Sequence, residues 1–332
     1  MRRDFQRNLG TFGSLTVNNL FLFVALMFFG EVRSGLEPQG AEPFLLLLTL
    51  LLLFPLSADP LGRIPASRLC LWPLSARQRA ALRSAALALS PVLWIALAAL
   101  LLMTRRPALG ALFLLAAVVV PAIATAGRRL SAQAHWNGLR WIPVFPGRLG
   151  VPIGNNLRQM FSTLDVYTAL VLSVTGSLYR AAGMAPVLSL VIGLALSTYA
   201  QCLFGLDWNG SGITRYRLLP LPAWQILLAK DAAFLGVLFL LVLPLSPIPG
   251  MTFGFTALAI GHFPSLVARL PQHRWRFTGG RASAGVVTAI GGLIMGSFAR
   301  SVMGPAVVAL SVGLYAASLY LSGRLWERAF QA

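Results

Sequence analysis

Long apolar runs, separated by short loops rich in arginine, constrain the fold of this sequence more than any other feature. Several of these runs approach the roughly 20 residues that a helix needs to cross the hydrocarbon core of a bilayer. The composition agrees, because 57% of the residues are hydrophobic and only 11% are charged. The alternating segments of about ten residues that a transmembrane barrel requires are not found. The sequence therefore predicts an all-α, polytopic integral membrane protein.

Ten apolar segments are predicted to be transmembrane helices in two related halves. They lie at about residues 15–30, 43–57, 84–103, 109–126, 166–179, 186–204, 232–245, 251–267, 284–298 and 302–322. Residues 1–126 form the first half, residues 127–165 a cytoplasmic connecting segment with an amphipathic run-in, and residues 166–332 the second half. No small-residue cleavage pattern follows the first apolar segment, so we expect a retained helix and not a signal peptide.

The distribution of basic residues predicts the orientation. With the N-terminus inside, the predicted inside segments hold 22 of the 27 basic residues and the outside segments hold 5. Cytoplasmic loops of membrane proteins are enriched in Lys and Arg in this way, so both termini are expected in the cytoplasm. The same sorting accounts for the net charge of +18. Contact with membrane lipid is therefore expected, and binding of nucleic acid is not.

One motif occurs twice, once in each half, in a predicted cytoplasmic loop. Aligned without a gap, Leu69–Arg83 and Asp207–Asp231 pair Pro73 with Pro220, Gln78 with Gln225 and Arg83 with Lys230. In the first copy Ser75 and Gln78 have the spacing of a capping box, in which each side chain bonds the backbone N–H of the other residue. In the second copy Pro222 suits the first turn of a helix. Each copy is therefore predicted to begin a helix at the membrane surface.

Two interpretations of these surface helices stay open. In the first they only begin helices, and Arg83 and Lys230 anchor them by placing apolar stems in the membrane and charges at its surface. In the second they are levers that a cytoplasmic partner pushes. The second copy runs directly into a long apolar segment, so a lever there would reach into the membrane.

Asp207 also has two interpretations. It lies in a Gly-rich loop near Arg215 and Arg217, either in a solvated turn or in an ion pair that fixes the loop. An ion pair would have a counterpart in the first copy, where one alignment gap places Asp59 opposite Asp207 and where Arg63 or Arg68 would be the partner.

No acidic residue lies in the middle of a predicted membrane helix, and no paired catalytic residues are found. The 9 acidic residues lie in loops or near helix ends, and the 3 histidines, at positions 135, 262 and 273, are isolated in the sequence. No motif of a metalloprotease, a serine hydrolase or a P-loop is found, and Lys230 is the only lysine. We therefore expect no catalytic, cofactor or metal site in this chain. Ion-coupled transporters use intramembrane acids and bases, so this expectation argues against an ion-driven mechanism.

Two further expectations concern glycine and cysteine. Gly292 and Gly296 have the spacing that permits close packing of two helices. This spacing indicates a dimer face, or it results merely from the high frequency of glycine in membrane helices. Cys70 and Cys202 show no metal-type spacing and are expected to be free thiols near the cytoplasmic side.

The residues around the second motif resemble those of a known family. Phe204–Lys230 resembles the loop between the second and third helices of bacterial ABC-2 type transporter permeases, and Leu157–Asp165 resembles their amphipathic run-in. The resemblance implies a permease subunit of an ATP-driven exporter in the bacterial inner membrane. Such a subunit is not an enzyme by itself, and a separate ATP-binding subunit docks on the run-in and the loop. The residues implied in this coupling are Pro220, Trp224, Gln225 and Lys230, with Pro73, Gln78 and Arg83 from the first copy.

The resemblance also bears on assembly. Members of the family often have six helices per subunit, so a homodimer or a paired permease is expected, and the ten predicted helices depart from that pattern. Two other classes stay open: an ATP-independent secondary transporter, and a membrane scaffold or enzyme without a transport role. A dedicated ATPase encoded beside this gene would favour the exporter.

Overall fold

The computed structural model describes residues 146–181, 188–208, 212–267, 272, 278, 280–301 and 303–331, and scattered positions between 75 and 115. These residues belong to two compact units, one containing the positions up to 115 and the other beginning at Pro146. All regular secondary structure among them is helical, as the sequence predicts. The domain boundaries proposed from the sequence stay a prediction.

The second unit contains eight described helices. They are α8 (Gly150–Met160), α9 (Leu164–Ala181), α10 (Leu188–Ala200), α11 (Gly212–Leu218), α12 (Ala223–Val242), α13 (Pro247–Val267), α14 (Ala282–Phe298) and α15 (Gly304–Gln331). By length and composition, three stretches among the described residues can cross a membrane: Ala223–Val242, Pro247–Val267 and Gly304–Glu327. Shorter apolar stretches lie in α9, α10 and α14.

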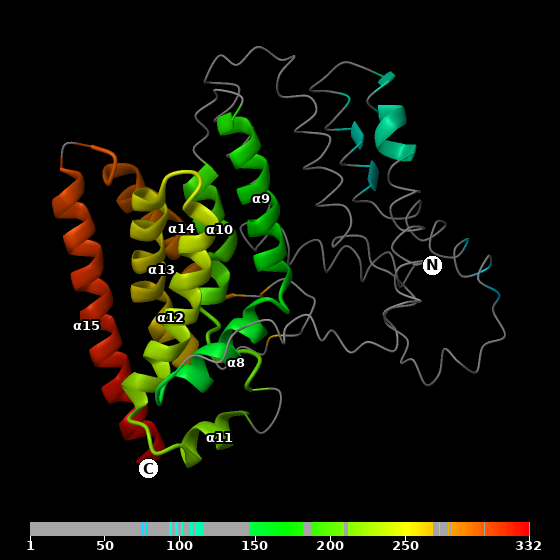
Figure 1. Cartoon of the computed structure of the whole chain (residues 1–332). Helices are drawn as coiled ribbons and strands as arrows, with labels where there is room; N and C mark the ends of the chain where they lie inside the picture. Colours follow the sequence, from blue (N-terminus) through cyan, green and yellow to red (C-terminus); the bar gives the residue numbers. More distant parts are fainter. Residues whose placement is uncertain are drawn as a thin grey trace. The chain divides into compact units, whose positions relative to one another are not determined.

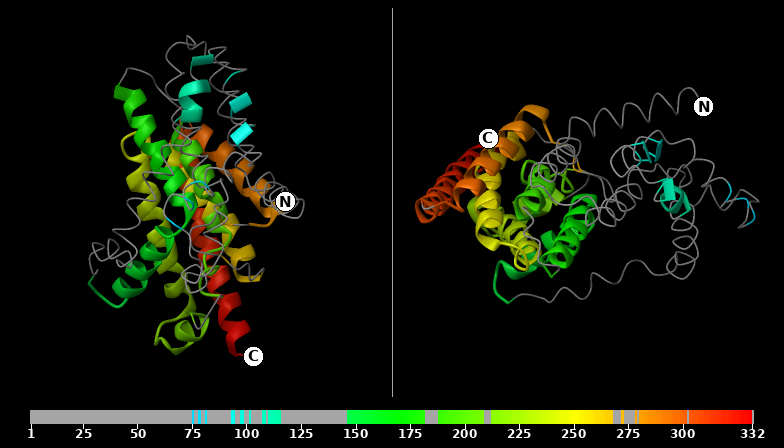
Figure 2. Two further views of the ribbon diagram at one scale, coloured as in Figure 1. Left: turned by 90° about the vertical axis from the view of Figure 1, so that its right-hand side faces the viewer. Right: turned by 90° about the horizontal axis from the view of Figure 1, so that it is seen from above.

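The longer helices lie side by side as a bundle, and α8 and α11 lie across one end of it (Figure 1). The C-terminal end of α15 lies at the same end, whereas the turn between α12 and α13 lies at the opposite end. The left-hand view in Figure 2, turned by 90°, shows the same arrangement, and the right-hand view looks down on the bundle from above. The run-in helix and the helix of the second motif therefore meet at one end of the bundle.

The second motif begins α12, as the sequence predicts. Pro222 immediately precedes this helix with φ −64° and ψ 151°, and the helix continues without interruption to Val242. A proline fits here because the first N–H groups of a helix have no intrahelical partner. The span predicted at residues 232–245 begins too late, since Lys230 and Asp231 already lie inside the helix and are buried.

The glycines of α14 pack within the chain. A Cβ atom at Gly292 would lie 2.7 Å from the ring of Phe253 in α13, and one at Gly296 would collide with Leu190 in α10. Both glycines are buried. The dimer-face interpretation of this pair is therefore wrong, because the close approach that the glycines permit is used by neighbouring helices of the same bundle.

The first unit contains the predicted capping box. The backbone N–H of Ser75 donates to Oε1 of Gln78 (2.8 Å), and the backbone N–H of Gln78 donates to Oγ of Ser75 (3.2 Å). The described positions between 93 and 115 are helical, in agreement with the two spans predicted there. Other predictions fall outside the described residues: the spans at 15–30 and 43–57, the sites Asp59, Pro73 and Arg83, and most of the connecting segment.

Candidate functional site

Two adjacent charged residues of α12, Lys230 and Asp231, are both buried, with 1% and 0% of their surface exposed. A charged side chain loses its hydration on burial and must find partners inside the protein. Successive residues of a helix point about 100° apart, so the two side chains meet different neighbours. Two separate polar clusters result, one towards α8 and α11 and one towards α13 and α15.

The first, which we call the Lys230 cluster, contains Lys230, Asp207, Asn156, Gln159 and Tyr216. The Nζ atom of Lys230 lies 2.7 Å from Oδ2 of Asp207 and 3.0 Å from Oδ1 of Asn156. Gln159 donates its side-chain N–H to the second Asp207 oxygen at 2.9 Å. Tyr216 donates its hydroxyl to Asn156 at 3.3 Å. The cluster thus ties α8, the turn at 201–208, α11 and α12 together.

Aromatic rings enclose the ammonium group of Lys230. It lies 4.7 Å from the ring centroid of Phe204 and 5.2 Å from that of Tyr216, within the range of a cation–π attraction. The Phe204 ring packs edge-on against the ring of Trp326 of α15, with the ring centroids 4.5 Å apart. Burial raises the pKa of the Tyr216 hydroxyl, with the Lys230 charge opposing that shift. The hydroxyl therefore stays protonated and available as a donor.

The structure corrects two interpretations of this region. Asp207 is 6% exposed and pairs with Lys230, so it is neither a solvated turn residue nor the partner of Arg215, whose side chain is exposed. Arg217 lies in α11. Lys230 is buried and therefore neither anchors α12 at the membrane surface nor presents its charge to a partner. The burial of Lys230 is only slightly indicated by the sequence: this residue is the only lysine of the chain, and it interrupts an apolar run.

Apolar residues are exposed where α11 leads into α12. Leu218 is 80% exposed, Leu219 38% and Trp224 42%. Pro220 is also exposed, whereas Gln225 is partly buried. We call Leu218, Leu219, Pro220 and Trp224 the α11–α12 corner. The usual distribution is inverted here, because charges are buried in the Lys230 cluster while large apolar side chains are exposed.

A third buried acid, Asp165, fixes another segment at the same end of the bundle. The backbone N–H of Thr278 donates to its carboxylate at 2.9 Å, and the Thr278 hydroxyl donates to the same oxygen. Gln272 donates its side-chain N–H to the Thr278 hydroxyl oxygen (2.7 Å) and its backbone N–H to the carbonyl of Gly205 (2.8 Å). Positions 272 and 278 are thereby held against α9 and the 201–208 turn.

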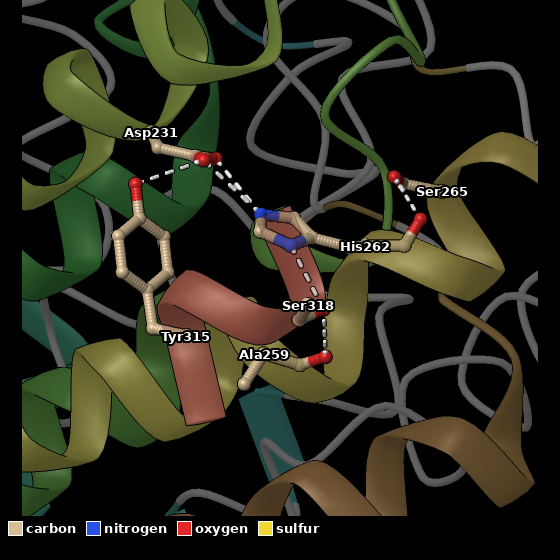
Figure 3. Close-up of polar contacts among 6 residues, drawn as sticks. All are labelled: Asp231, Ala259, His262, Ser265, Tyr315 and Ser318. Carbon is tan, nitrogen blue, oxygen red and sulfur yellow. Dashed lines mark hydrogen bonds and ion pairs between the residues drawn. The ribbon is translucent and has the colours of Figure 1, made fainter. Parts of the chain in front are cut away.

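The second cluster on α12, which we call the Asp231 cluster, lies among candidate membrane-spanning helices (Figure 3). The Nε2 atom of His262 lies 3.2 and 3.1 Å from the two Asp231 oxygens. Tyr315 donates its hydroxyl to Asp231 at 3.1 Å. On the other side of the ring, Nδ1 lies 3.0 Å from Oγ of Ser318, which donates to the carbonyl of Ala259 at 2.7 Å. The cluster joins α12, α13 and α15.

For His262, this cluster overturns the expectation that the histidines are isolated, and it places Asp231 inside a candidate membrane-spanning helix and not at its end. Asp231 and His262 are both 0% exposed and lie on neighbouring helices of the bundle. They are 31 positions apart in the sequence, so only the packing of α12 on α13 brings them together.

The residue types of a nucleophilic triad are present, but the geometry does not activate the serine. A serine nucleophile must give its proton to the base. The hydroxyl of Ser318 points to the carbonyl of Ala259 and so accepts a hydrogen bond from the imidazole of His262. The arrangement holds protons in place and does not prepare Ser318 for attack.

Among the described residues, no group of three or more His, Cys, Asp or Glu side chains is placed to hold a metal ion. Cys202 is buried and forms no disulfide within the described part of the chain, and Cys70 lies outside that part. No protein-family model, curated protein or solved structure matches this chain.

Proposed function

We propose that this protein is the membrane permease subunit of an ATP-driven, ABC-type exporter and works with a separate ATP-binding subunit. One observation supports this function above the others. The run-in helix and the loop that resemble those of ABC-2 permeases meet at one end of the bundle, tied by the Lys230 cluster beneath the α11–α12 corner. In the proposed assembly the ATPase subunit docks on this corner and on α8. ATP is bound and hydrolysed in that partner, and this chain has no catalytic role of its own.

The continuity of α12 suggests how the motion of the partner reaches the membrane. The helix has 20 residues and is therefore about 30 Å long, which matches the thickness of the hydrocarbon core. Force applied to Trp224 in its first turn is carried along the helix without an intervening loop. The Lys230 cluster makes α8 and α11 move together with α12, because separating them would break buried or partly buried hydrogen bonds of Asn156, Gln159 and Tyr216.

The proposal includes ten spans in the bacterial inner membrane with both termini in the cytoplasm. The basic residues of the bundle end support this orientation. Arg158 of α8, Arg215 of α11 and Arg324 near the end of α15 belong to elements gathered at one end (Figure 1). At the opposite end Arg180 donates to the carbonyl of Pro244 at 2.9 Å. Three of the described helices, α12, α13 and α15, contain stretches long enough to cross a membrane, and in the proposed assembly two copies of the chain form the working unit.

A matched pair of substitutions on α12 tests this function. Trp224 and Phe239 are each 42% exposed, but Trp224 lies in the first turn and Phe239 in the last. With the ATPase encoded beside this gene co-expressed, Trp224→Ala should weaken its binding by roughly 30-fold, since an anchoring aromatic residue contributes about 2 kcal/mol. Phe239→Ala should not change that binding. Equal ATPase recovery and equal coupled hydrolysis in both variants would reject the docking site.

The Asp231 cluster favours a second candidate, an ATP-independent secondary transporter. Acids and histidines buried among membrane helices mark ion pathways in such proteins. This candidate predicts that the chain alone, reconstituted in vesicles, moves its substrate when a pH gradient is imposed. The exporter predicts no movement without the ATPase subunit and ATP.

A further inference from the structure

We propose that the Asp231 cluster is a proton-binding site inside the helical bundle, in which one exchangeable proton is held between Asp231 and Nε2 of His262. The inference goes beyond the proposed function, because it holds whether ATP hydrolysis or an ion gradient drives the protein. It rests on the geometry of four side chains from three helices (Figure 3).

The surrounding hydrogen bonds fix the other protons of the cluster. A backbone carbonyl only accepts, so the Ser318 hydroxyl donates to Ala259 and its oxygen accepts from Nδ1–H of His262. Tyr315 donates its hydroxyl to Oδ2 of Asp231. The only position left open is the one between Nε2 and the carboxylate, at 3.1 and 3.2 Å.

The two occupancies of this position differ in net charge. With the proton present, the pair is neutral overall, whether the proton resides on the imidazole or on the carboxylate. When it leaves, a carboxylate faces the lone pair of Nε2 across 3.1 Å in a site with 0% exposure. Two acceptors then oppose each other, and a buried negative charge has lost its counter-charge, which is strongly unfavourable. Proton release should therefore loosen the contact between α12 and α13.

Other charged and titratable groups lie on the elements that pack against α12. Lys230, next to Asp231 on α12, is bound to Asp207. On α10, the ring of Tyr199 stacks on Phe234 at 6.3 Å. On the remaining elements that pack against α12, these groups are Arg158 of α8, Asp165, Tyr167, Tyr179 and Arg180 of α9, and Tyr320, Arg324, Glu327 and Arg328 of α15. Asp165 bonds Thr278, Arg180 bonds Pro244, and Arg324 bonds Tyr320 at 3.0 Å. Neither α13 nor α14 carries another titratable side chain.

Loading of the site is a simple proton transfer. A hydronium ion gives its proton to Nε2, an N–H bond forms, and water is released. No other bond changes, and Nδ1 keeps its proton throughout. The deprotonated site should therefore contain the Nδ1–H form of neutral histidine, which the bond to Ser318 selects.

Nitrogen-15 NMR of the full chain in lipid nanodiscs tests this assignment. The chain has 3 histidines, so the combined variant His135→Gln and His273→Gln leaves His262 as the single imidazole signal. As the pH is raised, the signal should change from a state protonated at both nitrogens, or shared with the carboxyl group, to the Nδ1–H form. A signal that stays in one state, or that ends in the Nε2–H form, would overturn the proposal.

Two tyrosines on α15 supply a matched control. Tyr315→Phe removes the hydrogen bond to Asp231, whereas Tyr320→Phe changes an exposed hydroxyl. Tyr315→Phe and Asp231→Asn should each displace the His262 transition by at least about one pH unit, which corresponds to 1.36 kcal/mol. Tyr320→Phe should leave it in place. An unchanged transition in Tyr315→Phe refutes the site even if Asp231→Asn does not fold. The measurement contains no ATPase, so its failure would leave the docking hypothesis intact.

Discussion

Replacing Lys230 with methionine tests the structural basis of the α8–α12 connection. The side chain is 1% exposed and its ammonium lies 2.7 Å from the Asp207 carboxylate, which is itself 6% exposed. Lys230→Met leaves that carboxylate buried with the Gln159 amide as its remaining bond from this cluster. Breaking a buried ion pair by removing one partner lowers the free energy of unfolding by about 3–5 kcal/mol. Asp207→Asn should have a comparable effect, because it leaves the ammonium unpaired.

The double variant distinguishes an ion pair from two independent contacts. When both charges are removed together, no buried charge lacks its partner, so the double variant should lose much less than the two single losses combined. The measurement is denaturant unfolding of the purified full chain in detergent, followed by tryptophan fluorescence. Arg215→Met is the control, since Arg215 is exposed and should change stability by no more than about 0.5 kcal/mol. Additive single effects, or a loss in Arg215→Met as large as in Lys230→Met, would refute the reasoning.

Two further predictions concern topology and packing. In a variant without the native cysteines, a membrane-impermeant thiol reagent added outside cells should label Ser246→Cys and not Leu218→Cys; the reverse would invert the orientation. Gly292→Leu should destabilise the protein by about 1–3 kcal/mol, because the added side chain collides with Phe253, whereas Gly313→Leu should not, since no atom lies within 4 Å of its Cβ position. Equal losses of unfolding free energy in the two glycine variants would contradict the packing of α14.

Local features of the fold were predictable from the sequence. Apolar runs identified the helices, and their approximate positions agree with α9, α10 and α12–α15. The spacing of Ser75 and Gln78 predicted a capping box whose two hydrogen bonds are present. Pro222 and the apolar residues after it predicted that α12 would continue from the motif into a possible span. Each of these features depends on a few neighbouring residues, so periodicity and capping chemistry suffice.

The partners of the buried charges were not predictable in the same way. Asp207 pairs with Lys230 because the turn at 201–208 folds back onto α12, which the nearby Arg215 gave no reason to expect. The Asp231–His262 contact, in contrast, could have been predicted from the sequence. Antiparallel helices joined near Leu245 bring residues at similar distances from the turn side by side, and both residues satisfy that condition. Because the span was predicted to begin at residue 232, Asp231 was expected at the membrane surface, and its contact with His262 was not predicted.

Site-specific photo-crosslinking tests directly whether a separate ATPase docks on the α11–α12 corner. A photoreactive amino acid replaces Trp224 or, as the control, Phe239, in membranes that contain the chain and the ATPase encoded beside it. Both positions are 42% exposed on the same helix, so differences in adducts report what each end of α12 contacts. Position 224 should form an adduct with a subunit that mass spectrometry identifies by its P-loop, and position 239 should form lipid adducts. Lipid adducts alone at position 224 would refute docking of the ATPase on this corner.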